Sequence, residues 1–222
     1  MNEKRQVPEI LASLRALTNP ANLAGMARYG INTRNALGIP VYQLRAMARE
    51  IGRNHELAMQ LWESGIHEAR ILATIIDEPA KVTRRQMNAW ARDFDSWDVC
   101  DQACGNVFRY TPHAWAMAEK WSSARAEFVR RAGFSLMAGL AGKAKDVPDA
   151  RFEALLPLIA AAATDDRNMV RKAVNWALRG IGKRNPNLRR SAIAAAQEIR
   201  RIDSRAARWI ASDALRELTS RS

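Results

Sequence analysis

The chain has 222 residues, 48% of them hydrophobic and 26% charged, which is typical of a folded globular protein and excludes a disordered one. Its mean hydropathy is -0.32, and no apolar run approaches the roughly 18–20 residues of a membrane helix. The N-terminal segment lacks the features of a secretion signal, so we expect a cytoplasmic protein that does not enter membranes. The net charge of +12 predicts a polyanionic partner, although a solvated basic face without any partner has the same composition.

Helical patterns extend along the whole chain. Ala, Leu, Arg and Met recur at three- and four-residue spacing and alternating β-branched runs are absent, so the sequence predicts amphipathic helices and an all-α fold. Turn and cap signals divide the chain into about twelve helices. In chain order these signals are Asn19-Pro20, Gly38-Ile39-Pro40, Asn54, Ser64-Gly65, Glu78-Pro79, Thr111-Pro112, Val147-Pro148, Thr164-Asp165-Asp166 and Asn185-Pro186.

The densest group of chemically active residue types lies at positions 93–102. The residues from Asp93 to Ser96 have the composition of a turn and a helix N-cap, where acidic side chains suit the helix dipole. Trp97 and Asp101 are four residues apart, so a helix places them on one face. Asp98 is one step round the helix, and we expect it to support the first turn.

Three segments resemble one another at intervals near 40 residues. Phe128–Met137 and Met169–Leu178 match at an offset of 41 residues, and Glu68–Ile76 is a weaker copy. A period of about 40 residues built from two helices is typical of HEAT and armadillo repeats, which stack into a curved solenoid. Because a single repeat cannot bury its apolar face, we expect one HEAT-like repeat domain over residues 1–222.

Basic residues recur in register in the two clear copies. Arg130-Arg131 in one copy corresponds to Arg171-Lys172 in the other, which would line basic side chains along the concave face of a solenoid. Residues 167–222 hold 14 Lys and Arg against 4 Asp and Glu, whereas the rest of the chain holds 21 against 19. Most of these residues are Arg, whose planar donor fork suits phosphate oxygens. The sequence therefore predicts a basic concave face that binds nucleic acid.

A carboxylate beside a tryptophan is unexpected on such a face, because a carboxylate repels phosphate. A carboxylate does stabilise the oxocarbenium-like sugar cation that forms when an N-glycosidic bond breaks, and the face of an indole favours a cationic base. Trp97 and Asp101 are therefore candidates for chemistry at such a bond. On composition alone, a capping Asp and a core Trp are the simpler interpretation.

Several motifs occur in a characteristic order and spacing. They are Met26-Ala-Arg-Tyr29, Leu37-Gly-Ile39, Ser96-Trp-Asp-Val-Cys-Asp101, Arg130-Arg-Ala132, Arg171-Lys-Ala-Val-Asn-Trp-Ala-Leu-Arg179 and Asn185-Pro186. Together they resemble the AlkD-like DNA alkylation repair family of HEAT-like proteins, over nearly the whole chain.

The resemblance implies a DNA glycosylase that excises cationic alkylpurines such as 3-methyladenine and 7-methylguanine from double-stranded DNA. It places Trp97 and Asp101 at the deoxyribose of the lesion, Arg131 and Tyr29 beside the DNA, and Trp176 in the same aromatic cleft. A cationic base leaves without being protonated, so the implied mechanism needs Asp101 only to stabilise the sugar cation and to position a water. No cofactor or metal is implied, and we expect a monomer.

Two alternative functions stay open. Some relatives bind DNA without excising a base, and this chain has Ser96-Trp97 where family members can carry two adjacent tryptophans. A non-catalytic protein that binds DNA structures is therefore the main alternative. A HEAT scaffold for a protein partner is disfavoured by the charge. In either DNA-binding case we expect Arg130, Arg171 and Lys172 to hold phosphates.

The other aromatic, cysteine and histidine residues are interpreted as structural. Too few ligands surround the two cysteines for a zinc site, so we expect Cys100 and Cys104 to be buried packing residues. Surface or capping positions are expected for His55, His67 and His113. Core positions are expected for Trp62, Trp90, Trp115, Trp121 and Trp209.

Overall fold

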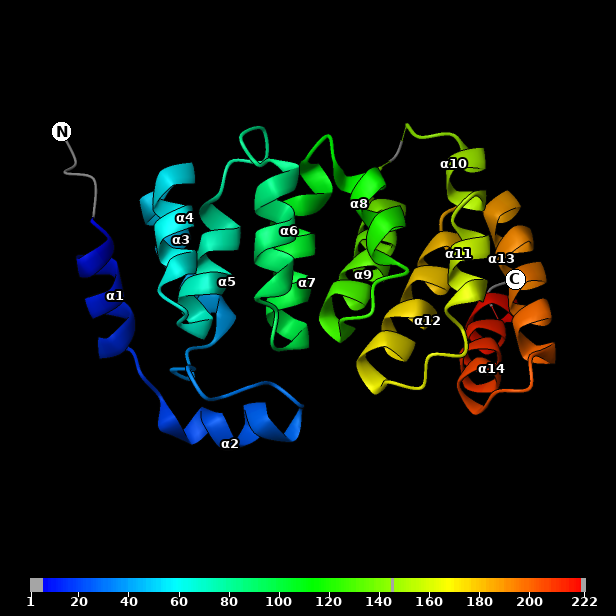
Figure 1. Cartoon of the computed structure of the whole chain (residues 1–222), viewed down its shortest axis with the longest axis horizontal. Coiled ribbons are helices and arrows are strands. Elements are labelled where there is room, and N and C mark those ends of the chain that lie inside the picture. Colours follow the sequence, from blue (N-terminus) through cyan, green and yellow to red (C-terminus); the bar gives the residue numbers. More distant parts are fainter. Residues whose placement is uncertain (1–5, 145, 221–222) are drawn as a thin grey trace. The chain divides into compact units, whose positions relative to one another are not determined.

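The computed structural model describes residues 6–144 and 146–220, which form α-helices and one 3-10 helix but no strand (Figure 1). The all-α prediction is confirmed. The contacts divide the chain into two compact units, one ending at Pro112 and the other beginning at His113. No described helix is long and apolar enough to cross a membrane.

The first unit is built around α5, which packs against α3, α4 and α7 and buries eight of its ten residues. The His67–Ile76 repeat segment is therefore a core helix. The elements of this unit are α1 (Val7–Ala16), α2 (Pro20–Arg28), α3 (Val41–Ile51), α4 (His55–Glu63), α5 (His67–Ile76), α6 (Arg84–Arg92), α7 (Trp97–Asn106) and the 3-10 helix η1 (Phe108–Tyr110).

A buried carboxylate on α5 shapes the loop before α3. The side chain of Glu68 is almost completely buried and accepts hydrogen bonds from the backbone N–H groups of Leu37, Gly38 and Ile39 at 2.7–3.2 Å. Gly38 has a φ of +77°, and a Cβ there would lie 2.2 Å from the carbonyl oxygen of Asn19. The Leu37-Gly-Ile39 motif is thus a tight loop that a side chain of α5 holds in place.

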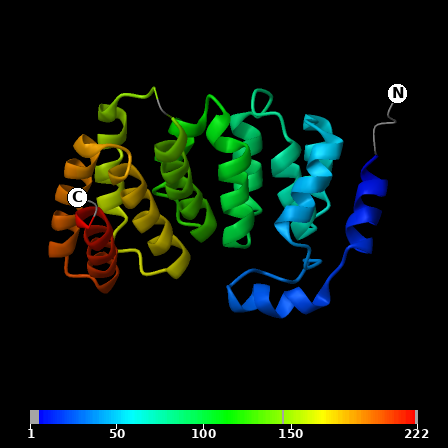
Figure 2. The ribbon, with the colours of Figure 1, turned by 180° about the vertical axis from the view of Figure 1, so that it is seen from behind.

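The second unit is built around α12, which packs against α9, α13 and α14. Figure 2 shows α12, in gold, between the green α9 and the red α14. The elements of this unit are α8 (Ala114–Trp121), α9 (Glu127–Lys143), α10 (Asp149–Glu153), α11 (Leu156–Ala161), α12 (Asn168–Gly182), α13 (Pro186–Arg201) and α14 (Arg205–Thr219).

The described residues contain fourteen α-helices, where about twelve were predicted. One added break separates α10 from α11. Pro157 follows Leu156 at the start of α11, and inside a continuous helix its ring would clash with the carbonyl of Glu153 and its missing N–H would cost a hydrogen bond. The chain therefore turns at this point and starts a new helix.

Two of the predicted repeat segments have the same local structure. Arg70 Nε donates to the carbonyl oxygen of Trp62 at 3.5 Å, and Arg130 Nε donates to that of Ser122 at 2.9 Å. Each arginine lies eight residues beyond its acceptor, near the start of α5 or α9, and ties that helix to the end of the helix before it. The weak copy at Glu68–Ile76 and the clear copy at Phe128–Met137 therefore share this link to the helix before them.

Candidate nucleic-acid site

The start of α7 is fixed by Asp98. Its carboxylate accepts hydrogen bonds from the Ser96 hydroxyl at 2.8 Å and the Val99 N–H at 2.9 Å, which confirms that it supports the first turn. Its other oxygen pairs with His67 Nε2 at 2.8 Å. The prediction of a surface or capping position for His67 is wrong, because this histidine lies on the buried face of α5 and finds its partner 31 residues away.

The two members of this pair shift each other's pKa. Burial disfavours the charged form of His67, but the hydrogen bond to Asp98 and the charge of that carboxylate outweigh burial and raise the pKa of His67 above 6.5. Burial likewise opposes the charged form of Asp98, but the hydrogen bonds from His67, Ser96 and Val99 lower the pKa of this carboxyl below 3.8. The pair is therefore an ionic link between α5 and α7 in mildly acidic solution.

Trp97, the first residue of α7, contacts the end of α2. Its indole N–H donates to the carbonyl oxygen of Tyr29 at 2.9 Å, across 68 positions of sequence. The Tyr29 ring itself is 71% exposed. The structure thus brings together two of the predicted site residues, and this contact sets the orientation of the indole.

Asp101 lies one helical turn beyond Trp97, and both side chains are half-buried. Cys100 and Cys104 of the same helix are buried and form no disulfide, so the prediction that they are packing residues is confirmed. The described residues contain no group of three or more His, Cys, Asp or Glu arranged to hold a metal ion. The partly open side of α7 therefore presents an indole and a carboxylate.

In the second unit, Arg130 and Arg131 both bond to protein groups. Arg130 Nη1 pairs with Asp165 at 3.0 Å, and Arg167 pairs with the same carboxylate at 2.6 Å. Arg131 is only 6% exposed, and its Nη1 donates to the carbonyl oxygen of Met169 at the start of α12, at 2.6 Å. In this structure both guanidinium groups connect α9 to the α12 region.

Arg171 and Lys172 are the corresponding residues of α12. The Arg171 guanidinium lies 4.7 Å from the ring centre of Trp209 and donates to the Asn168 side chain at 3.2 Å. Lys172 is exposed. Trp209 is 38% exposed, so the prediction that it is a core residue is wrong, and the guanidinium of Arg171 lies over its ring. Arg171, Lys172 and Trp209 form a cationic and aromatic surface that the sequence did not reveal.

Trp176 is also 38% exposed and lines a hollow of about 430 Å³. Several of its lining residues have small side chains. At one of them, Gly180, an added Cβ would lie 3.5 Å from the Cα of Ala138, so α9 and α12 pack closely there. The lining residues are Ala138, Ala141, Gly142, Trp176, Gly180, Lys183 and Arg184. A flat ring beside a cavity with cationic residues suits a sugar or a base.

Most of the other tryptophans are in the core, as predicted. Trp62, Trp90 and Trp121 are each 2% exposed, and the rings of Trp62 and Trp90 stack with centres 4.0 Å apart. Trp115 is only partly buried, and the guanidinium of Arg151 lies 5.0 Å from its ring centre.

Residues 10–218 match the family described as DNA alkylation repair enzyme. The chain belongs to this family. The chain is also similar to two Listeria proteins: the uncharacterized protein Lin0241 of Listeria innocua, 24% identical over 193 residues, and the uncharacterized protein Lmo0209 of Listeria monocytogenes, 22% identical over 193 residues. Each alignment covers 85% of this chain and 84% of the relative.

A solved structure superimposes on this DNA alkylation repair family member with a TM-score of 0.79 and 19% identity, covering 96% of this chain and 95% of the other. It is described as representing a new family of proteins related to the HEAT-like repeat DNA glycosylases, with affinity for branched DNA structures. The similarity confirms the HEAT-like repeat fold.

Proposed function

We propose that this member of the DNA alkylation repair family is a DNA glycosylase. It hydrolyses the N-glycosidic bond of cationic N-alkylated purines, such as 3-methyladenine and 7-methylguanine, in double-stranded DNA, acting as a monomer in the cytoplasm. The observation that supports this most directly is Asp101, a half-buried carboxylate one turn beyond Trp97, whose indole N–H bonds to the Tyr29 carbonyl. The link between His67 and Asp98 holds this turn in place.

In the proposed reaction, the bond between the sugar carbon and the base nitrogen breaks and its electron pair leaves with the base. The base carries a positive charge before cleavage and becomes neutral by accepting that pair, so it needs no proton. The Asp101 carboxylate stabilises the positive charge that develops on the sugar. A water oxygen then bonds to the sugar carbon, and the water releases its proton to the solvent, while Trp97 and Trp176 pack against the deoxyribose.

Phosphates on either side of the lesion would be bound by Arg130, Arg131, Arg171 and Lys172, with Tyr29 beside the DNA. Lys172 is the most accessible of the four basic residues, and Arg131 is the most buried. A phosphate contact by Arg131 requires its guanidinium to exchange the Met169 carbonyl for a phosphate oxygen.

The test is release of 7-methylguanine from methylated duplex DNA. Removing the charge in Asp101→Asn should slow single-turnover release by about 100-fold or more, as loss of a group that stabilises a charged transition state does. Asp95→Asn is the matched control, because Asp95 is an exposed carboxylate just before the same helix and bonds only outward, to Asn32. It should retain the wild-type rate. If Asp101→Asn also retains that rate, the assignment of Asp101 is wrong.

The alternative is a non-catalytic member that binds DNA structures. The structural neighbour favours it, because the description of that protein names affinity for branched DNA and not base excision. Under this alternative the wild-type protein releases no methylated base, and Asp101→Asn binds a four-way junction as tightly as wild type does. Measuring base release and junction binding on the same preparations separates the two functions.

A further inference from the structure

A second basic cluster lies in the first unit. We call it the arginine pocket and define it by Arg45, Arg49, Arg53, Arg109 and Tyr110. It comprises two hollows, one of about 320 Å³ lined by Arg45, Arg49 and Arg53, and one of about 470 Å³ lined by Arg45, Arg53, Arg109 and Tyr110. Both hollows are lined by Arg45, Arg53 and Ile75, so they adjoin each other and are treated as one recess.

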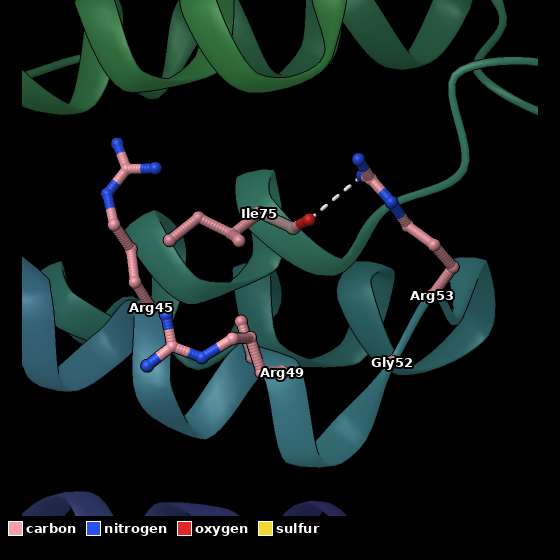
Figure 3. Close-up of a pocket in the computed structure, with 6 residues that line it drawn as sticks. Arg45, Arg49, Gly52, Arg53 and Ile75 are labelled. Carbon is pink, nitrogen blue, oxygen red and sulfur yellow. Dashed lines mark hydrogen bonds between the residues drawn. The ribbon is translucent and has the colours of Figure 1, made fainter.

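The backbone explains why these arginines gather. Arg45 and Arg49 are one turn apart on α3, which ends at Gly52 with a φ of +75°. The chain then turns so that Arg53 Nη1 donates to the carbonyl oxygens of Ile75 and Asp77, at the end of α5, at 2.9 and 2.5 Å. Figure 3 shows Arg45 and Arg53 extending on either side of Ile75. Arg53 thus closes the end of α5, and Arg45 and Arg49 line the recess beside it.

The charge of the pocket is not neutralised by the protein. Within the described part of the chain, none of its four arginines forms an ion pair. The two carboxylates that follow α5 are engaged elsewhere: Asp77 is buried and bonds to His55 and Gln86, and Glu78 pairs with Lys81 at 3.0 Å. Uncompensated guanidinium groups around a recess are suited to an anion, because each presents several N–H donors.

Tyr110 adds an aromatic edge to this cationic recess. The Arg109 guanidinium lies 4.7 Å from the Tyr110 ring centre and donates to the hydroxyl at 2.7 Å, and the ring is 52% exposed. An exposed ring with arginine stacked on it can contact a sugar or base next to a bound phosphate. This combination favours a nucleic-acid strand over a free inorganic anion.

The pocket is also separate from the candidate catalytic residues. Gly105 and Asn106, which line it, end α7, whereas Trp97 begins that helix. At 1.5 Å per residue along the helix axis, Gly105 lies about 12 Å from Trp97 but only about 6 Å, or one turn, from Asp101. The arginine pocket therefore adjoins the turn that carries Asp101 without including that residue, so the phosphates it binds would be those next to the nucleotide that contacts Trp97 and Asp101.

We propose that Arg45, Arg49, Arg53 and Arg109 form a binding site for backbone phosphates of DNA outside the lesion, with Tyr110 against the adjoining sugar or base. This inference rests on the proposed action on DNA. It assigns to the first unit a share of DNA affinity that the C-terminal excess of basic residues does not supply.

The test compares the affinity of wild type and of the triple variant Arg45→Gln/Arg49→Gln/Arg109→Gln for unmodified duplex DNA between 50 and 200 mM salt. Arg53 is kept because it closes α5. Each lost phosphate contact makes the slope of log affinity against log salt shallower by about 0.9. Over a fourfold rise in salt, that change in slope corresponds to about 3.5-fold in affinity. If all three arginines contact phosphates, the fold-loss of affinity on raising the salt should be about 40 times smaller for the variant than for wild type.

The control Arg15→Gln/Arg85→Gln/Arg92→Gln removes the same charge from three exposed arginines of the same unit. It should keep the wild-type slope. The single variant Arg49→Gln, on the exposed side of α3, should lose about 3.5-fold less affinity than wild type if the triple variant does not fold. A wild-type slope in the pocket variants, or an equal change in the control, overturns the proposal.

Base release separates this proposal from the proposed function. The pocket variants should release 7-methylguanine at the wild-type rate once the enzyme saturates the DNA, because neither Trp97 nor Asp101 lines the pocket. Failure of wild type to release the base contradicts the glycosylase proposal and leaves the salt-slope result to decide the pocket.

Discussion

Glu68 is a buried acid whose role is structural, and its three backbone donors make that role testable. The variant Glu68→Gln offers one carbonyl oxygen to the three N–H groups of Leu37, Gly38 and Ile39. At least one of them would lose its partner, at a cost of about 2 kcal/mol in the free energy of unfolding. Urea denaturation measures this loss. The exposed Glu63→Gln should change stability by less than about 0.5 kcal/mol, and an equally small effect at Glu68 contradicts the assignment.

The pair of His67 and Asp98 predicts a pH dependence of stability. The pKa of His67 is raised by folding, so its contribution is complete below the usual value of 6.5 and is lost as pH rises through the raised pKa. The pKa of Asp98 is lowered by folding, so its contribution is present above 3.8 and is lost as pH falls through the lowered pKa. The pair therefore stabilises the fold most between these limits.

Removing the imidazole in His67→Gln should accordingly lower Tm most near pH 5 to 6. The difference from wild type should shrink as pH rises above neutrality, because the neutral ring no longer forms an ionic pair with Asp98. Thermal unfolding of both proteins from pH 5 to pH 9 measures this. A difference that grows with rising pH would contradict the assigned charge state.

The candidate residues on α7 could be predicted because their spacing is local. Trp97 and Asp101 lie four residues apart in one helix, so helical periodicity alone places them on one side. The contact of Trp97 with Tyr29 and the pairing of His67 with Asp98 depend on residues 68 and 31 positions apart. No local pattern reports such contacts, because they depend on how α2, α5 and α7 pack.

Among the helices, α9 shows how one small residue controls the contact between repeat helices. A Cβ on Gly133 would lie 2.6 Å from the backbone nitrogen of Ser122 and 2.9 Å from the carbonyl carbon of Trp121. These are backbone atoms at the end of α8, so they cannot turn aside as a flexible side chain can. Close packing of α8 on α9 therefore requires glycine at this position.

The variant Gly133→Ala should lower the free energy of unfolding by about 1–3 kcal/mol, because the clash outweighs the better helix propensity of alanine. Gly142→Ala is the matched control on the same helix, since a Cβ there meets no atom within 4 Å. It should raise stability by up to about 1 kcal/mol. Chemical denaturation distinguishes these opposite signs, and a neutral Gly133→Ala would show that α8 and α9 can separate without cost.

Helix type and repeat period could be predicted from the sequence, whereas helix ends and arginine partners could not. The 41-residue offset correctly paired a segment of α9 with one of α12, because both bury the same face. The same register predicted phosphate ligands at Arg130 and Arg131, yet both side chains bond to Asp165 or Met169 in this structure. An arginine in sequence register can stabilise a repeat or bind a ligand, and only its contacts distinguish the two roles.

Over the whole chain, the basic pairs in repeat register at Arg130-Arg131 and Arg171-Lys172 predict that the helices carrying them, α9 and α12, contribute the charge that binds DNA. Lys172 of α12 and Lys120 of α8 are both exposed lysines of the second unit, so they differ in the helix that carries them and not in charge. If α9 and α12 form the DNA-binding face, only Lys172→Gln should make the salt slope of duplex binding shallower, by about 0.9, with Tm unchanged in both variants. Fluorescence anisotropy at several salt concentrations measures both slopes. Equal changes in the two variants would mean that DNA senses the net charge of this unit and not a particular face.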